Sequence, residues 1–225
     1  MIVNIENTNE VLNFGKSEQN KLSRLSADIL SSAKANGLNS MDDIICDLIA
    51  AFDGSTKSKR FNLFRKDSSK NVTNQVMNFV GKLEVSYLNV LNNVFDMEKI
   101  FNEINLVVGN LKNRISEGNQ FILSYNNTSE GNIERFKKVL HDLEISTIIA
   151  TQMMVQVQTI IISDKVLVKK IKYTIQNTIP IWKDSNDSVD SVVEELKAVL
   201  GDCQNNMKNH QKLQLNPQAK EDRSV

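Results

Sequence analysis

The sequence predicts an all-α protein: an elongated helical bundle built on a long antiparallel helical hairpin, with a short N-terminal helical hairpin before it. Only 8 Gly and 2 Pro occur among its 225 residues, so the chain has little of the turn chemistry that a many-stranded sheet needs. A hydrophobic share of 40% is ordinary for a chain that buries a core. Two long runs of apolar residues, spaced alternately by three and four positions, indicate helices.

The N-terminal segment, residues 1–53, is predicted to form the short hairpin. Apolar residues at helical spacing favour a first helix over residues 11–35, which is expected to break at Asn36–Gly37. A second helix is expected over residues 41–52, because Asn39–Ser40 offers an N-cap and acidic residues follow in the first turn.

Residues 54–69 lose the helical pattern and are predicted to form a basic linker. Within them, the run Lys57–Lys66 places phenylalanines between basic side chains. A run of this kind is able to contact a nucleic acid backbone or anionic lipid, but a solvated linker is the favoured interpretation. Nucleic acid is therefore not an expected partner, and membrane contact through Lys57–Lys66 is possible but not favoured.

Residues 70–203 are predicted to form the long hairpin or bundle. The chain is expected to reverse at a cluster of small polar residues, Tyr125–Gly131. The stripe before this turn, which skips one polar turn near Ser86, consists of Val76, Phe79, Leu83, Val90, Val94, Met97, Phe101, Ile104, Val108, Leu111 and Ile115. The stripe after it consists of Leu140, Leu143, Thr147, Ala150, Met154, Val157, Ile161, Asp164, Val168, Ile171, Ile175 and Thr178. Because such stripes need cover, each helix is expected to bury the seam of the other, as in a coiled coil.

One segment of the second stripe, Met153–Ile162, is apolar around most of its circumference. It is therefore expected to be buried by more than one neighbour. An alternative hypothesis is a membrane-acting helical protein that inserts Met153–Ile162 after a conformational change. Because apolar stretches of this length are more often buried core, this alternative is not favoured.

The end of the long helix is marked by Pro180, which lacks an amide donor and disfavours helical geometry at Ile179. The helix is expected to end or kink there. A last amphipathic helix is expected over residues 189–200. The polar tail, residues 204–225, is predicted to be disordered.

The charges and cysteines exclude several classes of protein. Lys and Arg number 27, as do Asp and Glu, so no net charge attracts the chain to nucleic acid or an acidic membrane. Neither a secretory signal nor a transmembrane span is expected, which favours the cytoplasm. The two cysteines form neither a disulfide framework nor a metal-binding pair. We expect reduced thiols, with Cys46 buried.

The polar residues do not predict a catalytic, cofactor or metal site. The two histidines, His141 and His210, lack companions at metal-ligand spacing, and Asp142 and Glu144 beside the first are interpreted as surface residues. No glycine-rich phosphate loop occurs. The expectation is a protein that is not an enzyme and holds no cofactor and no metal.

Four residues are candidates for contact with a partner or an anion: Lys165, Lys169, Lys172 and Trp182. The three lysines share one helix face by their spacing and either attract an oxyanion or keep the outer face solvated. The single tryptophan either fills the core at the helix kink or anchors a partner surface. For both features the structural role is the favoured one.

Part of the chain resembles a known family. The stretch from Asp142-Leu143-Glu144 through Ala150-Thr151-Gln152-Met153 and Gln156-Val157-Gln158 to Asn177-Thr178-Ile179-Pro180-Ile181-Trp182-Lys183 is similar to the most recognisable block of the toxic anion resistance family, the tellurite resistance TelA proteins. The opening Phe14-Gly15, followed by a Ser-rich amphipathic helix, is also similar. The resemblance spans roughly residues 11–184.

The chain departs from that family after Lys183, where Asp184-Ser185-Asn186 replaces the usual Gln and a further long helical segment is missing. The resemblance therefore implies a short or truncated member. An Arg that family members carry near Gln156-Val157-Gln158 is also absent, so no anion role is transferred to that position. The function implied is a non-enzymatic cytoplasmic stress-response protein that acts by protein binding or self-association through its long helices.

Overall fold

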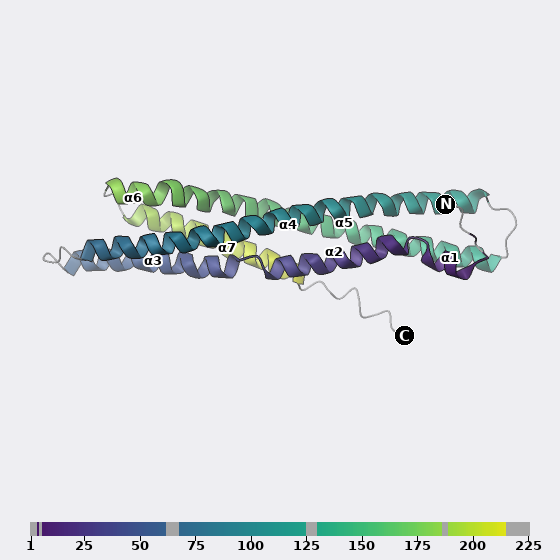
Figure 1. Ribbon diagram of the computed structural model, residues 1–225, viewed down its shortest axis with the longest axis horizontal. Helices are drawn as coiled ribbons and strands as arrows, with labels where there is room; N and C mark the ends of the chain where they lie inside the picture. The colour runs from purple at the N-terminus through teal and green to yellow at the C-terminus, as the bar shows by residue number, and fades with distance from the viewer. Residues whose placement is uncertain (1–3, 5, 62–67, 125–129, 186–188, 215–225) are drawn as a thin grey trace. The chain divides into compact units, whose positions relative to one another are not determined.

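The computed structural model describes residues 4, 6–61, 68–124, 130–185 and 189–214. Every regular element in these ranges is a helix, and they contain no strand, which confirms the all-α prediction (Figure 1). The helices are α1 (Thr8–Asn13), α2 (Lys16–Lys34), α3 (Leu38–Phe61), α4 (Ser68–Ser124), α5 (Glu130–Tyr173), the π-helical turn η1 (Thr174–Thr178), α6 (Ile179–Ser185) and α7 (Val189–Gln214).

The described helices belong to two compact units. Unit 1 comprises Met1–Ser31 and Met97–Thr159, and unit 2 comprises Ser32–Asp96 and Ile160–Val225. These boundaries differ from the predicted ones at 1–53, 54–69, 70–203 and 204–225. The difference arises because α2, α4 and α5 each contribute residues to both units.

In unit 1, the second half of α4 packs antiparallel to the first half of α5. Phe136 of α5 is fully buried and meets the rings of Phe14 at 5.2 Å and Phe121 of α4 at 6.0 Å, both edge-on. A Cβ placed on Gly118 of α4 would collide with Leu140 of α5. Since later residues of α4 contact earlier residues of α5, the predicted hairpin is present in this unit, although its turn at 125–129 lies outside the described residues.

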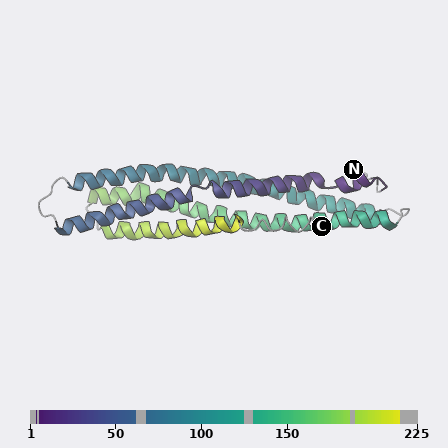
Figure 2. The same ribbon diagram turned by 90° about the horizontal axis from the view of Figure 1, so that it is seen from below.

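In unit 2, α3 packs along α7, as Figure 2 shows. The apolar core of this unit includes Leu48 and Phe52 of α3, Leu83 of α4, Leu167 of α5 and Leu196 of α7, all almost inaccessible to solvent. Ser86, the polar residue at which the predicted stripe was interrupted, is buried too and donates a hydrogen bond to the Gly37 carbonyl at 3.3 Å. The stripe is therefore continuous in space.

Glycine sets the two breaks in the N-terminal part of the chain. The predicted helix over 11–35 is divided into α1 and α2 at Gly15, which has a φ of 75°. The first of these helices, α1, begins after its N-cap Asn7 and ends at Asn13, just before this break. The second break, predicted at Asn36–Gly37, is confirmed, since Gly37 has a φ of 74°. Both glycines adopt the left-handed conformation that other residues rarely tolerate.

Pro180 changes the helix before it, but does not stop it. The chain passes from α5 through η1 into α6, where the Ile179 amide donates to the Thr174 carbonyl five residues back. A proline ring clashes with the carbonyl four residues earlier and provides no donor. The wider π turn accommodates the missing amide donor of Pro180. The disturbance that was expected at Ile179 is therefore a π turn within a helix that continues.

Two predicted boundaries are wrong. The second N-terminal helix does not end at residue 52, because α3 continues through Phe61 into the predicted linker, while residues 62–67 lie outside the described part of the chain. The predicted disordered tail is helical in residues 204–214, where α7 buries Asn206, His210 and Leu213. Residues 215–225 lie outside the described part. In both segments the polar composition concealed a helix, and in residues 204–214 buried contacts support it.

Candidate functional site

A buried polar cluster lies within the core of unit 2. Asp164 occupies a position of the apolar stripe of α5 and has no solvent-accessible surface. Its carboxylate receives a hydrogen bond from Asn206 Nδ2 at 2.9 Å through Oδ1, while Oδ2 lies 2.8 Å from His210 Nε2. Both partners are on α7 and are almost completely buried. A buried charge of this kind is costly unless it is paired and hydrogen-bonded, as it is here.

The arrangement assigns the proton on the imidazole of His210. An ionised carboxylate can only accept hydrogen bonds, so Nε2 of His210 donates to Asp164. The other ring nitrogen, Nδ1, is buried and has no hydrogen-bond partner among the described protein residues. It is therefore the one nitrogen of the buried cluster that is left to interact with a small polar molecule.

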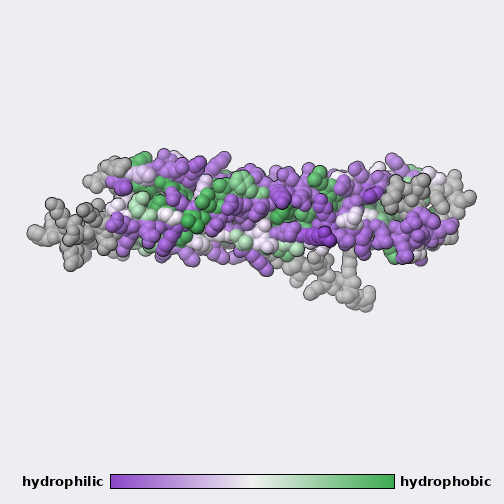
Figure 3. Space-filling view, in the orientation of Figure 1, coloured by the Kyte–Doolittle hydropathy of each residue, from purple (hydrophilic) through white to green (hydrophobic). Residues whose placement is uncertain are grey.

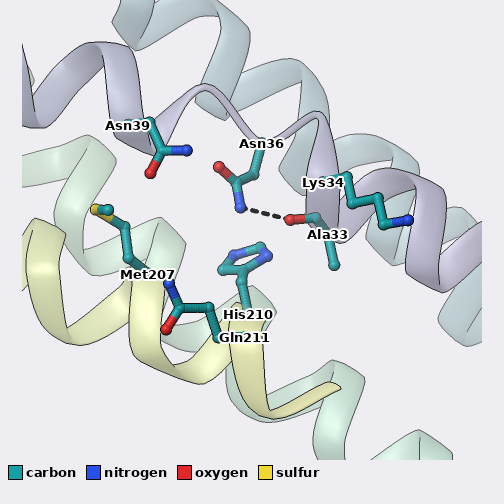
Figure 4. Close-up of a pocket in the computed structure, with 7 residues that line it drawn as sticks. All are labelled: Ala33, Lys34, Asn36, Asn39, Met207, His210 and Gln211. Carbon is teal, nitrogen blue, oxygen red and sulfur yellow. Dashed lines mark hydrogen bonds between the residues drawn. The ribbon is translucent and has the colours of Figure 1, made fainter. Parts of the chain in front are cut away.

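His210 lines a hollow of about 220 Å³ between α7 and the connection from α2 to α3 (Figure 4). Asn36 lies above the ring and donates a hydrogen bond to the Ala33 carbonyl at 2.7 Å, while its own carbonyl accepts from the Leu38 amide at 2.9 Å. Lys34 extends away from the ring in this view. The lining supplies amide donors and acceptors in both directions, so it does not select one charge of ligand.

The described residues do not combine into a metal centre or a catalytic triad. No group of three or more His, Cys, Asp or Glu side chains lies close enough within them to hold a metal ion. His141, the other histidine, is exposed and lies 3.4 Å from Glu144 one turn along α5, in keeping with the surface interpretation of both residues.

The π turn is tied to α7 by a single carboxylate. Glu195 accepts hydrogen bonds from Thr174 Oγ1 at 2.9 Å and from Thr178 Oγ1 at 2.7 Å. Thr174 also donates to the Lys170 carbonyl at 3.1 Å. Because Thr174 and Thr178 are the first and last residues of η1, these bonds hold the widened turn against α7.

The structure places the candidate lysines on the solvent side of α5. Lys165, Lys169 and Lys172 are exposed. Lys170, which the prediction did not select, forms an ion pair with Asp202 of α7. The three candidates therefore lie on the outer surface of the helix, where contact with a partner or an anion stays a prediction.

Trp182 packs into the core of unit 2. Its ring meets the ring of Phe52 edge-on, with centroids 4.8 Å apart and planes at 85°. Phe52 is fully buried, and Trp182 is partly exposed. The contact supplies the core-filling role expected for the residue that follows Pro180, while its remaining exposed surface leaves the role of a partner contact as a prediction.

A second candidate surface is the uncharged part of α5. Residues 145–163 contain no charged side chain. The prediction that Met153–Ile162 is buried by several neighbours is wrong for four residues. Val155 is 61% and Ile162 56% exposed, and Gln158 and Thr159 are exposed as well. Ile148, two turns before Val155, is 59% exposed. In Figure 3, apolar surface appears as green patches among hydrophilic ones on the face in view.

The helical stretch that contains α5 also bears on the expectation that the chain has no transmembrane span. The helical stretch Gly131–Lys183 is long and apolar enough to cross a membrane by length and composition, and only 22% of its most apolar window, with a mean hydropathy of 1.5, is buried. The expectation that the chain has no transmembrane span therefore stays a prediction. Length and composition alone are weak evidence for a span, because core helices of soluble proteins pass as well.

The two cysteines differ in their surroundings. Cys46 is exposed, which contradicts the expected burial: its position on α3 follows the buried Ile45 and turns away from the core. Cys203 is buried and its Sγ donates to the Leu38 carbonyl at 3.4 Å. Burial, with a smaller contribution from the charges of Asp42 and Asp164, raises the pKa of the Cys203 thiol to about 12.

Sequence reasoning missed His210 and Asn206 because it ended the last helix too early. A usable signal was present. The stripe Leu196, Val199, Cys203, Asn206, His210 and Leu213 continues the three-four alternation of α7 through two polar residues. In the same way, Asp164 interrupts an apolar stripe of α5. Polar residues at core positions of two helices predict each other as partners.

The fold and the cluster define an all-α protein with long packed helices, whose unit 2 is cross-linked by a buried Asp–His pair. The family model of the toxic anion resistance protein (TelA) matches residues 112–188. The TelA-like protein SSP1345 of Staphylococcus saprophyticus is 23% identical over 229 aligned positions. Both matches are to the TelA family, which confirms the resemblance seen in the sequence.

These similarities have defined extents. The alignment with the staphylococcal protein covers 84% of this chain and 61% of that relative, so the chain spans about three fifths of the relative's length. No solved structure matches the chain. The family match contains Asp164 and the whole of η1, whereas Asn206, His210 and Glu195 lie beyond its last residue.

Proposed function

We propose that this chain acts in resistance to toxic anions as a non-enzymatic, cytoplasmic stress-response protein that works by binding protein through its long helices. The observation that carries the proposal is the exposed, uncharged face of α5. A protein surface normally mixes charged residues among its apolar ones, and a long helix face without charge is typical of an interaction site.

Three further observations support a binding role. The uncharged segment 145–163 lies wholly within the residues that match the TelA family. The exposed Lys165 and Lys169 follow it on the same helix and give the face a polar rim. The buried polar cluster of Asp164, Asn206 and His210 is bonded within itself, which favours a role in packing.

The test is survival of cells exposed to tellurite. Cells of the native host that lack the endogenous protein would carry either the wild-type chain or the Val155→Glu variant, at matched protein levels. We expect the wild type to restore growth and the variant to fail, because a charge at the centre of the face opposes its burial in a complex.

The matched control for this experiment is Val85→Glu. Val85 of α4 is 61% exposed, as is Val155, but lies on another helix. Equal survival with wild type and both variants would contradict a role for the α5 face. Failure of the wild type to change tellurite survival would contradict the anion-resistance role itself.

A second candidate function, membrane action by the same segment, is favoured by the apolar window of Gly131–Lys183. In it, Met153–Ile162 would enter the bilayer interface with its exposed side chains, Val155 and Ile162. Flotation with liposomes of anionic and zwitterionic lipid tests it. Recovery of the protein with the lipid would support membrane action, and recovery only in the dense fraction would contradict it.

A further inference from the structure

The exposed face of α5 has a pattern that reads almost the same in both chain directions. With 3.6 residues per turn, positions within seven of Val155 that share its face are 148, 151, 152, 158, 159 and 162. All of them are exposed. They are Ile148, Thr151, Gln152, Gln158, Thr159 and Ile162.

Val155 is the centre of this pattern. Glutamines stand three positions before and after it, threonines four positions before and after, and isoleucines seven positions before and after. A twofold interface brings the same patch of two copies together. In an antiparallel helix pair with its axis at Val155, each position meets one about equally far on the other side of Val155, so the pattern places apolar positions against apolar ones and polar positions against polar ones.

Charged residues stand on both sides of the uncharged run, at similar distances from Val155, and the charges on the two sides are opposite in sign. Glu144 stands eleven positions before Val155, and Lys165 and Lys169 stand ten and fourteen positions after it. All three are exposed. In an antiparallel pair centred on Val155, Glu144 of one copy comes between Lys165 and Lys169 of the other, at both ends of the contact. A parallel pair would place each charge beside the same residue of the second copy, so that charges of like sign would repel each other.

From these observations we propose that α5 binds α5 of a second copy of this chain, antiparallel, with the twofold axis at Val155. The proposal rests on the protein-binding role proposed above and names the partner. Val155 packs on Val155 of the second copy, and Ile148 packs on Ile162 of the second copy. Gln152 faces Thr159 of the second copy, so that its amide N–H can donate to the Thr159 hydroxyl oxygen, while that hydroxyl keeps its own proton on the Val155 carbonyl.

The pattern favours a protein partner over lipid. Two of the seven face positions are Gln, whose amide groups would lack partners in hydrocarbon, whereas the hydroxyls of Thr151 and Thr159 already donate to the Thr147 and Val155 carbonyls of the same helix. In a helix pair the glutamine amides meet polar side chains of the second copy. The acidic end of the face, at Glu144, would in addition be repelled by an anionic membrane surface.

Disulfide trapping tests the register. In a Cys46→Ser background, which removes the exposed native thiol, Val155→Cys is expected to form a covalent dimer under mild oxidation, because the two sulfurs face each other. Ile148→Cys alone is not expected to do so, since its two copies lie about 21 Å apart along the pair and a disulfide spans Cα atoms less than about 7 Å apart. Ile148→Cys combined with Ile162→Cys restores the covalent dimer. The native Cys203 is buried and stays in place in every variant.

Sedimentation equilibrium measures the same contact without a cross-link. Val155→Glu is expected to raise the dimer dissociation constant by more than about tenfold, whereas Val85→Glu, at an equally exposed valine of α4, leaves it unchanged. Glu144→Lys weakens the dimer, and adding Lys169→Glu to the same chain partly restores it.

Four outcomes would overturn the antiparallel dimer. They are a monomer at all concentrations, equal cross-linking of Val155→Cys and Ile148→Cys, equal effects of the two glutamate substitutions, and monomeric protein that floats with lipid. If the protein is a monomer at all concentrations but tellurite survival still depends on Val155, only the proposed partner, a second copy of the chain, is contradicted. If the dimer is intact but neither the wild type nor any variant changes tellurite survival, only the proposed function is contradicted.

Discussion

At the scale of single residues, Asp164 decides how α5 and α7 are held together in unit 2. Its neighbours along the stripe, Ile161 and Val168, are apolar, and within the described part of the chain its carboxylate is hydrogen-bonded to Asn206 and His210 from α7. A buried hydrogen-bonded polar cluster adds little stability compared with well-packed apolar side chains, but the loss of one partner is severe. The cluster therefore fixes which turns of the two helices face each other.

We expect His210→Ala to lower the free energy of unfolding by about 3–5 kcal/mol, because the Asp164 carboxylate would stay buried without its partner. Urea denaturation measures the change. His141→Ala is the matched control, since this histidine is exposed on α5 and should change stability by less than about 0.5 kcal/mol. Equal effects of the two substitutions would contradict the structural role of the pair.

The two thiols should react at different rates with an aromatic disulfide reagent. Cys46 is exposed and should react in the native protein, although slight burial and the nearby Asp42, Asp43 and Asp47 raise its pKa and slow the reaction. Cys203 is buried and should react only after unfolding. Absorbance after mixing, compared between the Cys46→Ser and Cys203→Ala variants, assigns each phase. Fast reaction of Cys203 would contradict its burial.

The same thiol should weaken the fold in alkali. The pKa of Cys203 is raised from 9.0 to about 12. Below pH 9.0 the thiol is protonated in both states, so its contribution to stability is fully present there. As the pH rises from 9.0 to about 12 only the unfolded chain loses the proton, and stability falls. Cys203→Ala should remove this part of the slope in denaturation midpoints measured across that range.

At the scale of elements, the contact between α4 and α5 in unit 1 depends on a close approach at Gly118. A Cβ at this position would collide with Leu140, which is buried and has little room to move. The sequence showed only that a glycine inside a helix is unfavourable by about 1 kcal/mol. The opposite helix explains why it is there.

Gly118→Ala should therefore lower the melting temperature, with an overpacking cost of about 1–3 kcal/mol that exceeds the gain in helix propensity. Gly109→Ala, on the same helix, is the matched control: its Cβ would meet nothing within 4 Å, so it should raise stability by up to about 1 kcal/mol. Differential scanning calorimetry measures both variants. A higher melting temperature for both variants would show that the Leu140 side chain moves aside without loss of stability, which would contradict the prediction.

The predicted helices were most accurate where apolar residues recur over many turns. Val90, Met97, Ile104 and Leu111 of α4 are all buried, as the three-four spacing predicted. The ends of helices were predicted less well. The end of α7 was missed because Asn206 and His210 are polar, and their partner Asp164 is more than forty residues away in the chain. The sequence around either residue does not predict a partner that is so far away in the chain.

At the scale of the whole molecule, the described chain forms two compact units that share three helices. Unit 2 includes α7, whose last two turns carry Asn206, His210 and Leu213 into its core. These turns lie in the segment that composition alone assigns to a disordered tail. Their removal is therefore a test of what the tertiary contacts contribute.

A chain that ends at Asn205 should unfold at a lower temperature than a chain that ends at Gln214. The shorter chain leaves Asp164 without either hydrogen-bond partner, and Leu213 no longer covers the core. Hydrogen exchange should show the largest loss of protection in residues 160–173, around Asp164. Identical protection in the two chains would contradict the buried cluster.

The sequence by itself determined the helical class, the apolar stripes of α4 and α5, the disturbance at Pro180 and the family resemblance, because all of these depend on residues close together in the chain. Only the tertiary structure decided that Asp164 pairs with His210, that Trp182 packs on Phe52, and which apolar residues of α5 stay exposed. Periodicity reports that a helix has an apolar side, but whether that side is covered depends on where other helices begin and end. For α5, that difference is what leaves its uncharged face available for a partner.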